Sequence, residues 1–180
     1  MWMDIESALL KNALKHAEDR MNYEFDRFKQ NDDFRFDKIL IGTIGELVFK
    51  KFLDENNLEY SMEFQAGKYD EKDFSIGEAI YEIKTSGYKD QEGFSNLNLL
   101  YNADQYRNSL DKKFEYVVQI FINGYDRKAR KLNIDNVNKA FIAGYIKFDS
   151  VKNFPLVQNI YHSNYKVSLN ALDDIKEIID

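Results

Sequence analysis

The residues of this chain whose types and spacing could do chemistry lie in one stretch, residues 73–84, with the sequence DFSIGEAIYEIK. We interpret it as two short strands joined by a tight turn at Gly77. Side chains alternate between the two faces of a strand, so Glu82 and Lys84 point the same way. The hairpin can then present Asp73 beside them. Two carboxylates next to an ammonium group are what a hard divalent cation and an attacking water require.

A solvent-facing pair is the alternative interpretation of Glu82 and Lys84, because a Glu and a Lys two positions apart on an exposed strand usually form only a hydrated face. Three features favour a site. The strand is rich in β-forming residues, Asp73 precedes it across a hairpin, and an upstream helix carries Glu46. Asp70 is also nearby, but Asp73 begins the alternating strand, whereas Asp70 is better placed to shape the preceding turn.

The helix predicted over residues 38–55 is apolar around most of its circumference, so we expect it to be buried. Gly42 and Gly45 each cost about 1 kcal/mol relative to Ala inside a helix, which predicts close approach of another backbone. Glu46 follows one turn after Gly42. A carboxylate on a buried helix needs a partner: either a salt bridge to Lys50, four residues on, or a metal ion. The sequence leaves both open.

Two more helices are predicted before the C-terminal third of the chain. Residues 4–29 form an amphipathic pattern with Asp4 as its N-cap, and Asp37 is expected to cap the helix that follows. The second helix covers residues 96–110, with Ser95 as a cap and Gln105 one turn beyond an inward-facing Tyr101. Its other inward-facing residues are predicted to be Leu97, Leu100 and Leu110.

The remaining strands are predicted from β-branched and aromatic runs. The run at residues 114–122 (FEYVVQIFI) is continuous, which is typical of a central buried strand. Weaker patterns predict strands at residues 58–64, 140–148 and 165–167, and a terminal helix at 169–179.

The composition indicates a globular domain. The 180 residues are 44% apolar and 15% aromatic, and the chain holds a single proline, so we expect one domain with a sizeable core. Cysteine is absent, which excludes disulfides, a thiol nucleophile and Cys-ligated zinc, and is compatible with a reducing compartment. No signal-like segment and no run of about 18 apolar residues is seen. We therefore expect a cytoplasmic protein without a membrane partner.

The charge is unevenly distributed. A net charge of −6 argues against a protein that coats nucleic acid non-specifically. Residues 101–131 nevertheless carry seven Lys or Arg against four Asp or Glu, a net of +3. The basic residues of the GYDRKARK segment form either a solvated loop or one that grips phosphate; they are Arg127, Lys128, Arg130 and Lys131. In the loop after the hairpin, Tyr88 and Lys89 are also available to a ligand.

The order of these motifs resembles the PD-(D/E)xK nuclease superfamily. The matching pieces are Gly45-Glu46, Asp73-Phe74, Glu82-Ile83-Lys84 and Gln105, with Lys72 where many members have proline. The resemblance implies an α/β, restriction-endonuclease-like single domain, in which a mixed β-sheet is flanked by α-helices. Residues 38–123 would form the catalytic core, residues 1–37 an N-terminal helical extension, and residues 124–180 C-terminal strands and a helix.

The resemblance also implies a role for each matching residue. Asp73, Glu82 and the backbone carbonyl of Ile83 would hold Mg²⁺, for which Mn²⁺ can substitute. Lys84 would orient or activate the water and stabilise developing negative charge. Two further roles follow: Glu46 would hold a second metal, directly or through water, and Gln105 would position a water on the metal or the phosphate.

Three functions are compatible with the sequence. The first is a metal-dependent endodeoxyribonuclease acting on DNA, of restriction or defence type or a structure-specific repair enzyme; a homodimer would suit symmetric duplex sites. The second is a catalytically silent nuclease-fold module that binds DNA or a protein, which the acidic net charge favours. The third, a Mg²⁺ hydrolase for a small phosphorylated substrate, has no Gly-rich phosphate loop to support it.

Overall fold

A six-stranded mixed sheet in the order β1-β9-β6-β4-β3-β2 forms the centre of the protein. The computed structural model describes residues 1–21, 32–62, 73–88, 97–158 and 162–179. The strands of this sheet are β1 (Trp2–Asp4), β2 (Tyr60–Met62), β3 (Phe74–Ile76), β4 (Ala79–Gly87), β6 (Tyr116–Ile122) and β9 (Lys139–Lys147). The chain thus forms a mixed α/β domain, as the sequence predicts.

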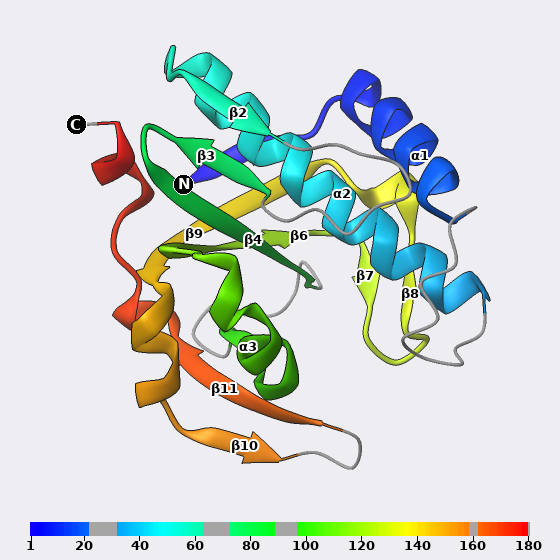
Figure 1. The fold of residues 1–180 in the computed structure, drawn as a ribbon. Coiled ribbons are helices and arrows are strands. Elements are labelled where there is room, and N and C mark those ends of the chain that lie inside the picture. The colour runs from blue at the N-terminus through cyan, green and yellow to red at the C-terminus, as the bar shows by residue number, and fades with distance from the viewer. Residues whose placement is uncertain (22–31, 63–72, 89–96, 159–161, 180) are drawn as a thin grey trace.

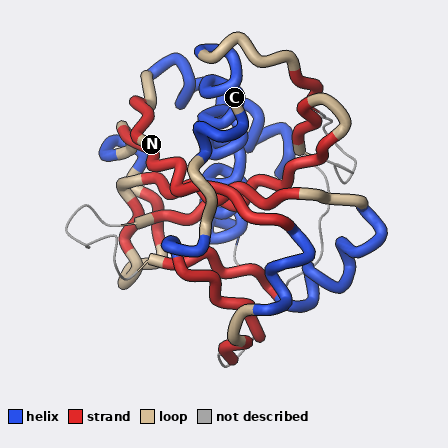
Figure 2. The backbone as a smooth tube through the Cα atoms, turned by 90° about the vertical axis from the view of Figure 1, so that its left-hand side faces the viewer, coloured by secondary structure: helices blue, strands red, loops and turns tan. Residues whose placement is uncertain are grey.

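Two layers cover the sheet (Figure 1). One face packs against α1 (Ser7–Met21) and α2 (Asp32–Glu55), which lie side by side. The other face packs against α3 (Ala103–Ser109) and a small sheet in the order β10-β11-β5. Its strands are β5 (Asn98–Asn102), β10 (Leu156–Gln158) and β11 (Ser163–Ser168). Figure 2 shows the central strands crossing the molecule with helical segments on both sides.

The predicted hairpin is confirmed. β3 and β4 pair antiparallel, and the turn between them places Gly77 at φ +58°, a conformation that glycine adopts without steric cost. β4 alternates as expected: Tyr81 and Ile83 belong to the core beneath α2, whereas Ile80 belongs to the core beneath α3. Glu82, which also has an even number, therefore points toward the α3 layer.

The buried central strand is also confirmed. β6 is buried from its second residue onward and lies between β4 and β9. Its pairing with β4 is parallel, and parallel neighbours need a crossover connection. The segment containing β5 and α3 makes that crossover (Figure 1). This connection brings Gln105 of α3 within reach of Lys84 on β4.

The N-terminal helix boundaries differ from the prediction. Asp4 is not an N-cap but the last residue of β1, where it pairs with Lys139 of β9. Asp37 lies inside α2, and its carboxylate accepts the Leu132 amide at 2.8 Å. Both differences arise because a residue distant in sequence supplies the partner. The end of the first predicted helix, from residue 22, lies outside the described residues.

The helix predicted at residues 96–110 was wrong in its first half, which is the strand β5. The Asn102 side chain caps α3 by accepting the amides of Asp104 and Gln105 at 2.9 and 3.0 Å; Ser95 lies outside the described residues. β5 is a strand because it pairs with β11, more than 60 residues away. Leu100 on β5 is exposed, and so is Leu110, which follows α3. Leu97 and Tyr101 are buried as predicted.

The C-terminal region is mostly strand and 3₁₀-helix. The strands predicted at 140–148 and 165–167 correspond to β9 and β11. The predicted terminal helix was wrong, since only two short 3₁₀ turns form there. The 3₁₀-helices are η2 (Leu110–Lys112), η3 (Ile134–Asn136), η4 (Phe148–Asn153), η5 (Leu169–Ala171) and η6 (Ile175–Ile178). No helix within the described ranges has the length and apolarity needed to cross a membrane.

The two glycines of α2 have different environments. A Cβ atom on Gly45 would lie 1.8 Å from Oγ1 of Thr85 in β4, whereas nothing lies within 4 Å of a Cβ on Gly42. A close approach therefore occurs only at Gly45, and the neighbour there is the side chain of Thr85 rather than the predicted backbone. Thr85 Oγ1 is itself buried and has no hydrogen-bond partner among the described residues, so α2 and β4 are packed tightly at this point.

Substituting the two glycines by alanine should change stability in opposite directions. Gly45→Ala should lower the free energy of unfolding by about 1–3 kcal/mol, because the methyl group overpacks the α2–β4 contact. Gly42→Ala should raise it by about 0.5–1 kcal/mol through helix propensity alone. Urea denaturation of both variants measures the difference. Equal effects would contradict the tight contact at Gly45.

Candidate functional site

The candidate site lies just beyond the last β3–β4 pair, where, among the described residues, β4 is paired only with β6 and its other edge is open. The last β3–β4 pair is Phe74 with Tyr81. Asp73 stands just before β3, and its Oδ2 accepts the backbone N–H of Ile83 at 2.6 Å. The side chain of Asp73 thus takes the place of the missing strand partner on this edge of β4.

The carbonyl of Ile83 points to the same edge. Even-numbered backbone groups of β4 face β6, since the Ile80 carbonyl accepts the Glu115 amide. The N–H and C=O groups of one strand residue point to the same side, so the Ile83 carbonyl faces the edge that Asp73 occupies. A side-chain oxygen and a main-chain oxygen are therefore available together there.

Glu82 and Lys84 form the second part of the site. The Glu82 side chain is 11% exposed, and its Oε1 accepts from Lys84 Nζ at 2.5 Å. Its Oε2 accepts from the hydroxyl of Tyr101. Lys84 Nζ also lies 3.5 Å from Oε1 of Gln105 on α3. The structure thus brings together Glu82, Lys84 and Gln105, as predicted, and adds Tyr101.

Glu46 is paired, but not with the predicted partner. Arg20 of α1 donates to both of its carboxylate oxygens, at 3.1 and 2.9 Å, and to Thr43 Oγ1 at 3.2 Å. Lys50 instead binds Asp54 at 2.6 Å. Glu46 therefore forms an ion pair in this structure. The Arg20 contact is bidentate, and bidentate charge-assisted hydrogen bonds are stronger than neutral ones.

Arg20 was not predicted, although the sequence carried a weak signal for it. Ala13 and Ala17 are the buried residues of α1, and Arg20 follows them at helical spacing, so it lies on the inward face. A cation on an inward helix face needs an anionic partner. The sequence contains 31 acidic residues, and nothing in it selects Glu46 among them.

Negative charge converges on Asp73. Burial, followed by the nearby carboxylates of Glu46 and Glu82, raises the pKa of Asp73 to about 8, while the Ile83 amide and Lys84 oppose the shift. The three acids come from α2, from the start of β3 and from β4. A cation at this position would relieve their mutual repulsion.

The donor set fits Mg²⁺ better than a metal that requires many protein ligands. Within the described ranges, no group of three or more His, Cys, Asp or Glu side chains is arranged to hold a metal ion. Mg²⁺ commonly takes only one or two carboxylates and keeps several waters. Asp73 and Glu82 with the Ile83 carbonyl match that pattern. Both oxygens of Glu82 already accept hydrogen bonds, as do both oxygens of Glu46.

Of the two residues after the hairpin that were predicted to contact DNA, the structure describes only Tyr88. Tyr88 is 3% exposed and packs beside the ring of Trp2, with centroids 6.4 Å apart. This burial argues against contact with DNA. Lys89 lies outside the described residues.

The four basic residues of the GYDRKARK segment lie on an exposed hairpin of β7 (Tyr125–Asp126) and β8 (Lys131–Leu132). We call this the basic hairpin. Asp126 Oδ1 stabilises its turn by accepting the amides of Lys128 and Ala129 at 2.8 and 3.0 Å. A Cβ on Gly87 would meet Tyr125 Cβ at 2.3 Å, so the basic hairpin rests against the end of β4, three residues beyond Lys84.

Lys38 adds to this basic surface, and the sequence analysis missed it. The Asp37 carboxylate accepts the Leu132 amide, so this part of α2 lies next to the basic hairpin. Burial, together with the charge of Arg130, lowers the pKa of Lys38. This neighbourhood joins residues 92 positions apart in the chain. Helical periodicity places Lys38 on α2 but says nothing about the hairpin that packs there.

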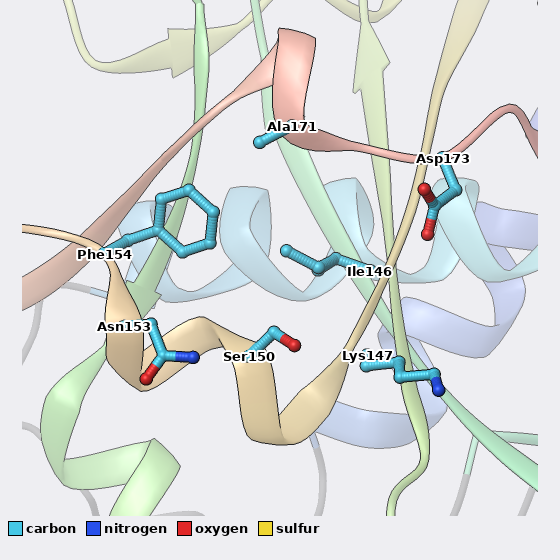
Figure 3. A pocket seen from close by; sticks show the side chains of 7 residues that line it. All are labelled: Ile146, Lys147, Ser150, Asn153, Phe154, Ala171 and Asp173. Atoms are coloured by element: carbon cyan, nitrogen blue, oxygen red, sulfur yellow. The ribbon is translucent and has the colours of Figure 1, made fainter.

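A separate pocket of about 380 Å³ lies away from these residues, between the end of β9, η4 and η5 (Figure 3). Its lining residues are Ile146, Lys147, Ser150, Asn153, Phe154, Ala171 and Asp173. None of the predicted site residues lines it, so it plays no part in the functional argument.

Comparison of the chain with protein-family models, with curated proteins and with solved structures finds no match.

Proposed function

We propose that this chain is a Mg²⁺-dependent endodeoxyribonuclease with a restriction-endonuclease-like fold of the PD-(D/E)xK type. One observation carries the proposal. At the edge of β4 beyond its last pair with β3, Asp73 accepts the backbone N–H of Ile83, and Glu82 and Lys84 flank Ile83 on β4. A mixed sheet flanked by helices and a Gln105 within reach of Lys84 agree with the expectation from the motif order.

Asp73, Glu82 and the Ile83 carbonyl would hold Mg²⁺ or Mn²⁺. Such an ion would neutralise charge on the phosphodiester and make a water nucleophilic at neutral pH. Asp73 must ionise to bind it, and its raised pKa means that binding competes with a proton. Metal affinity should therefore increase with pH up to about 8.

Lys84 and Gln105 would act on the phosphate and the water. The Lys84 ammonium group is held between Glu82 and Gln105, and a fixed positive charge beside the scissile phosphate stabilises negative charge that develops in the transition state. Glu46 would hold a second metal only by exchanging its ion pair with Arg20, just as Glu82 is paired with Lys84 before a metal binds.

A catalytically silent binding module is the second candidate, and a specific observation favours it. Both oxygens of Glu82 already accept hydrogen bonds, from Lys84 and from Tyr101. Metal binding at Oε1 would have to compete with the Lys84 contact. In a module that only binds DNA or a protein, this ion pair would be a permanent part of the structure.

A cleavage assay separates the two candidates. Wild type and Asp73→Ala should be incubated with supercoiled, linear and single-stranded DNA, with Mg²⁺ or Mn²⁺ and with EDTA as control. Metal-dependent cutting by wild type alone supports the nuclease. If no substrate is cut and calorimetry finds no Mn²⁺ binding that depends on Asp73, the binding module is the better conclusion.

The basic hairpin should contribute to DNA affinity without recognising sequence. Replacing Arg127, Lys128, Arg130 and Lys131 by Gln should weaken DNA binding and reduce the slope of log affinity against log salt by up to about 3–4, close to 0.9 for each lost phosphate contact. Binding is measured by fluorescence anisotropy at several salt concentrations.

A control for this variant replaces Lys147 and Lys152 by Gln. Both are exposed, and they lie at and after the last residue of β9, whereas the basic hairpin precedes the first. Their removal should leave the salt slope unchanged. An unchanged slope in the quadruple variant would contradict a role for the basic hairpin in DNA binding and would favour a protein partner.

A further inference from the structure

Tyr101 connects the two charged residues of β4. Its hydroxyl donates to Oε2 of Glu82, and Nζ of Lys84 lies 4.6 Å from the centre of its ring. A cation at this distance from an aromatic face is attracted by it. One side chain therefore contacts both the carboxylate and the ammonium group of the candidate site.

The position of Tyr101 is itself rigidly determined. The residue is fully buried on β5, and its ring makes edge contacts with Tyr106 and Phe148, at centroid distances of 6.0 and 5.9 Å. A carboxylate oxygen can only accept a hydrogen bond, so the Tyr101 hydroxyl is the donor in its contact with Glu82. The hydrogen bond thus has a fixed direction.

We propose that Tyr101 is a positioning residue that orients the Glu82 carboxylate for metal binding; this inference rests on the proposed function. A carboxylate oxygen has two lone pairs. Tyr101 occupies one on Oε2 and fixes the orientation of the group, and the other remains for a cation. Partners of this kind, which orient a metal ligand without touching the metal, commonly contribute 10- to 100-fold to metal affinity.

Tyr101→Phe removes only the hydroxyl and keeps the ring beneath Lys84. Its Mn²⁺ affinity, measured by calorimetry, should fall by about 10- to 100-fold. Tyr106→Phe is a matched control: Tyr106 belongs to the same aromatic cluster, is 4% exposed, and its hydroxyl has no hydrogen-bond partner within the described residues. That variant should bind Mn²⁺ as wild type does.

A second measurement tests the contact without metal. In ¹³C spectra of glutamate-labelled protein, the Glu82 carboxyl signal is the one lost in Glu82→Gln. Tyr101→Phe should shift this signal and Tyr106→Phe should not. A purely structural role for Tyr101 would lower the melting temperature while leaving both the signal and the metal affinity of the folded protein unchanged, and that result would overturn the inference.

The outcomes also separate this inference from the proposed function. If wild type binds Mn²⁺ and Tyr101→Phe binds it equally well, Tyr101 is not a positioning residue, while the metal site stands. If wild type binds no Mn²⁺, the metal site is wrong and the inference fails with it, whatever the Glu82 signal shows.

Discussion

Replacing Lys84 by methionine should slow DNA cleavage by about 10²- to 10⁴-fold, the range typical of losing one proton-transfer or charge-stabilising group. The methionine keeps most of the length of the side chain and removes its charge. In the wild type this charge lies 2.5 Å from Glu82 and 3.5 Å from Gln105. Single-turnover rates at saturating Mg²⁺ measure the loss in the chemical step.

The same substitution should strengthen Mn²⁺ binding. Lys84 occupies Oε1 of Glu82, so its removal frees a ligand oxygen and deletes a positive charge that repels the cation. Lower activity combined with tighter metal binding distinguishes a residue that acts on the substrate from one that merely supports the site. Weaker Mn²⁺ binding by Lys84→Met would contradict this assignment.

Lys50→Met is a suitable control for these measurements. Lys50 is also a lysine in a close ion pair, with Asp54 at 2.6 Å, but the pair is exposed on α2. Both the cleavage rate and the Mn²⁺ affinity of this variant should match those of wild type. A comparable loss of activity in Lys50→Met would show that the assay responds to removal of surface charge in general.

In metal-free buffer, the wild-type free energy of unfolding should fall relative to that of Asp73→Asn as the pH rises from about 4 to about 8. Burial, Glu46 and Glu82 raise the pKa of Asp73 from 3.8 to about 8 in the folded protein. Between these values the folded state holds a proton that the unfolded state has lost. The stabilisation that protonated Asp73 gives the folded wild type is therefore fully present below pH 4 and is lost by pH 8. Between these values the free energy of unfolding should fall by up to about 1.4 kcal/mol per pH unit.

Urea denaturation of both proteins between pH 4.5 and 8.5 measures this difference. Asparagine resembles the protonated carboxyl group and keeps an oxygen for the Ile83 amide, so subtracting its curve cancels the titration of other groups. Addition of Mg²⁺ at pH 8 should stabilise wild type and leave Asp73→Asn nearly unchanged, because the ion binds the ionised carboxylate.

Asp54→Asn provides a control with the opposite sign. Its hydrogen bond with Lys50 lowers the pKa of Asp54, so the stability from that contact is present above the ordinary pKa and is lost only as the pH falls. Wild type and Asp54→Asn should therefore differ by a constant amount between pH 5 and 8. Parallel curves for wild type and Asp73→Asn would show that Asp73 is ionised throughout this range.

The local sequence pattern was sufficient to predict the hairpin that carries the candidate site. The alternation along β4 determines that Tyr81 and Ile83 face one layer and Glu82 the other, because the period of a strand is two residues in any tertiary context. The run of β-branched and aromatic residues in β6 predicted a buried strand for the same reason. Gly45 indicated a close contact on α2, since glycine inside a helix carries a cost that packing must offset.

The partners of Glu46, Glu82 and β5 could not be predicted from the sequence, because they come from distant segments that only the folded chain brings together. Arg20 binds Glu46 across 26 positions, and Tyr101 binds Glu82 across 19, so neither pair leaves a periodic signal in the chain. β5 is a strand rather than the start of a helix because β11 lies beside it. Propensity and periodicity act over a few neighbouring residues, whereas ion pairs and strand pairing join segments that only the folded chain brings together. The sequence therefore determined which residues could do chemistry, and the tertiary structure decided which groups hold them in place.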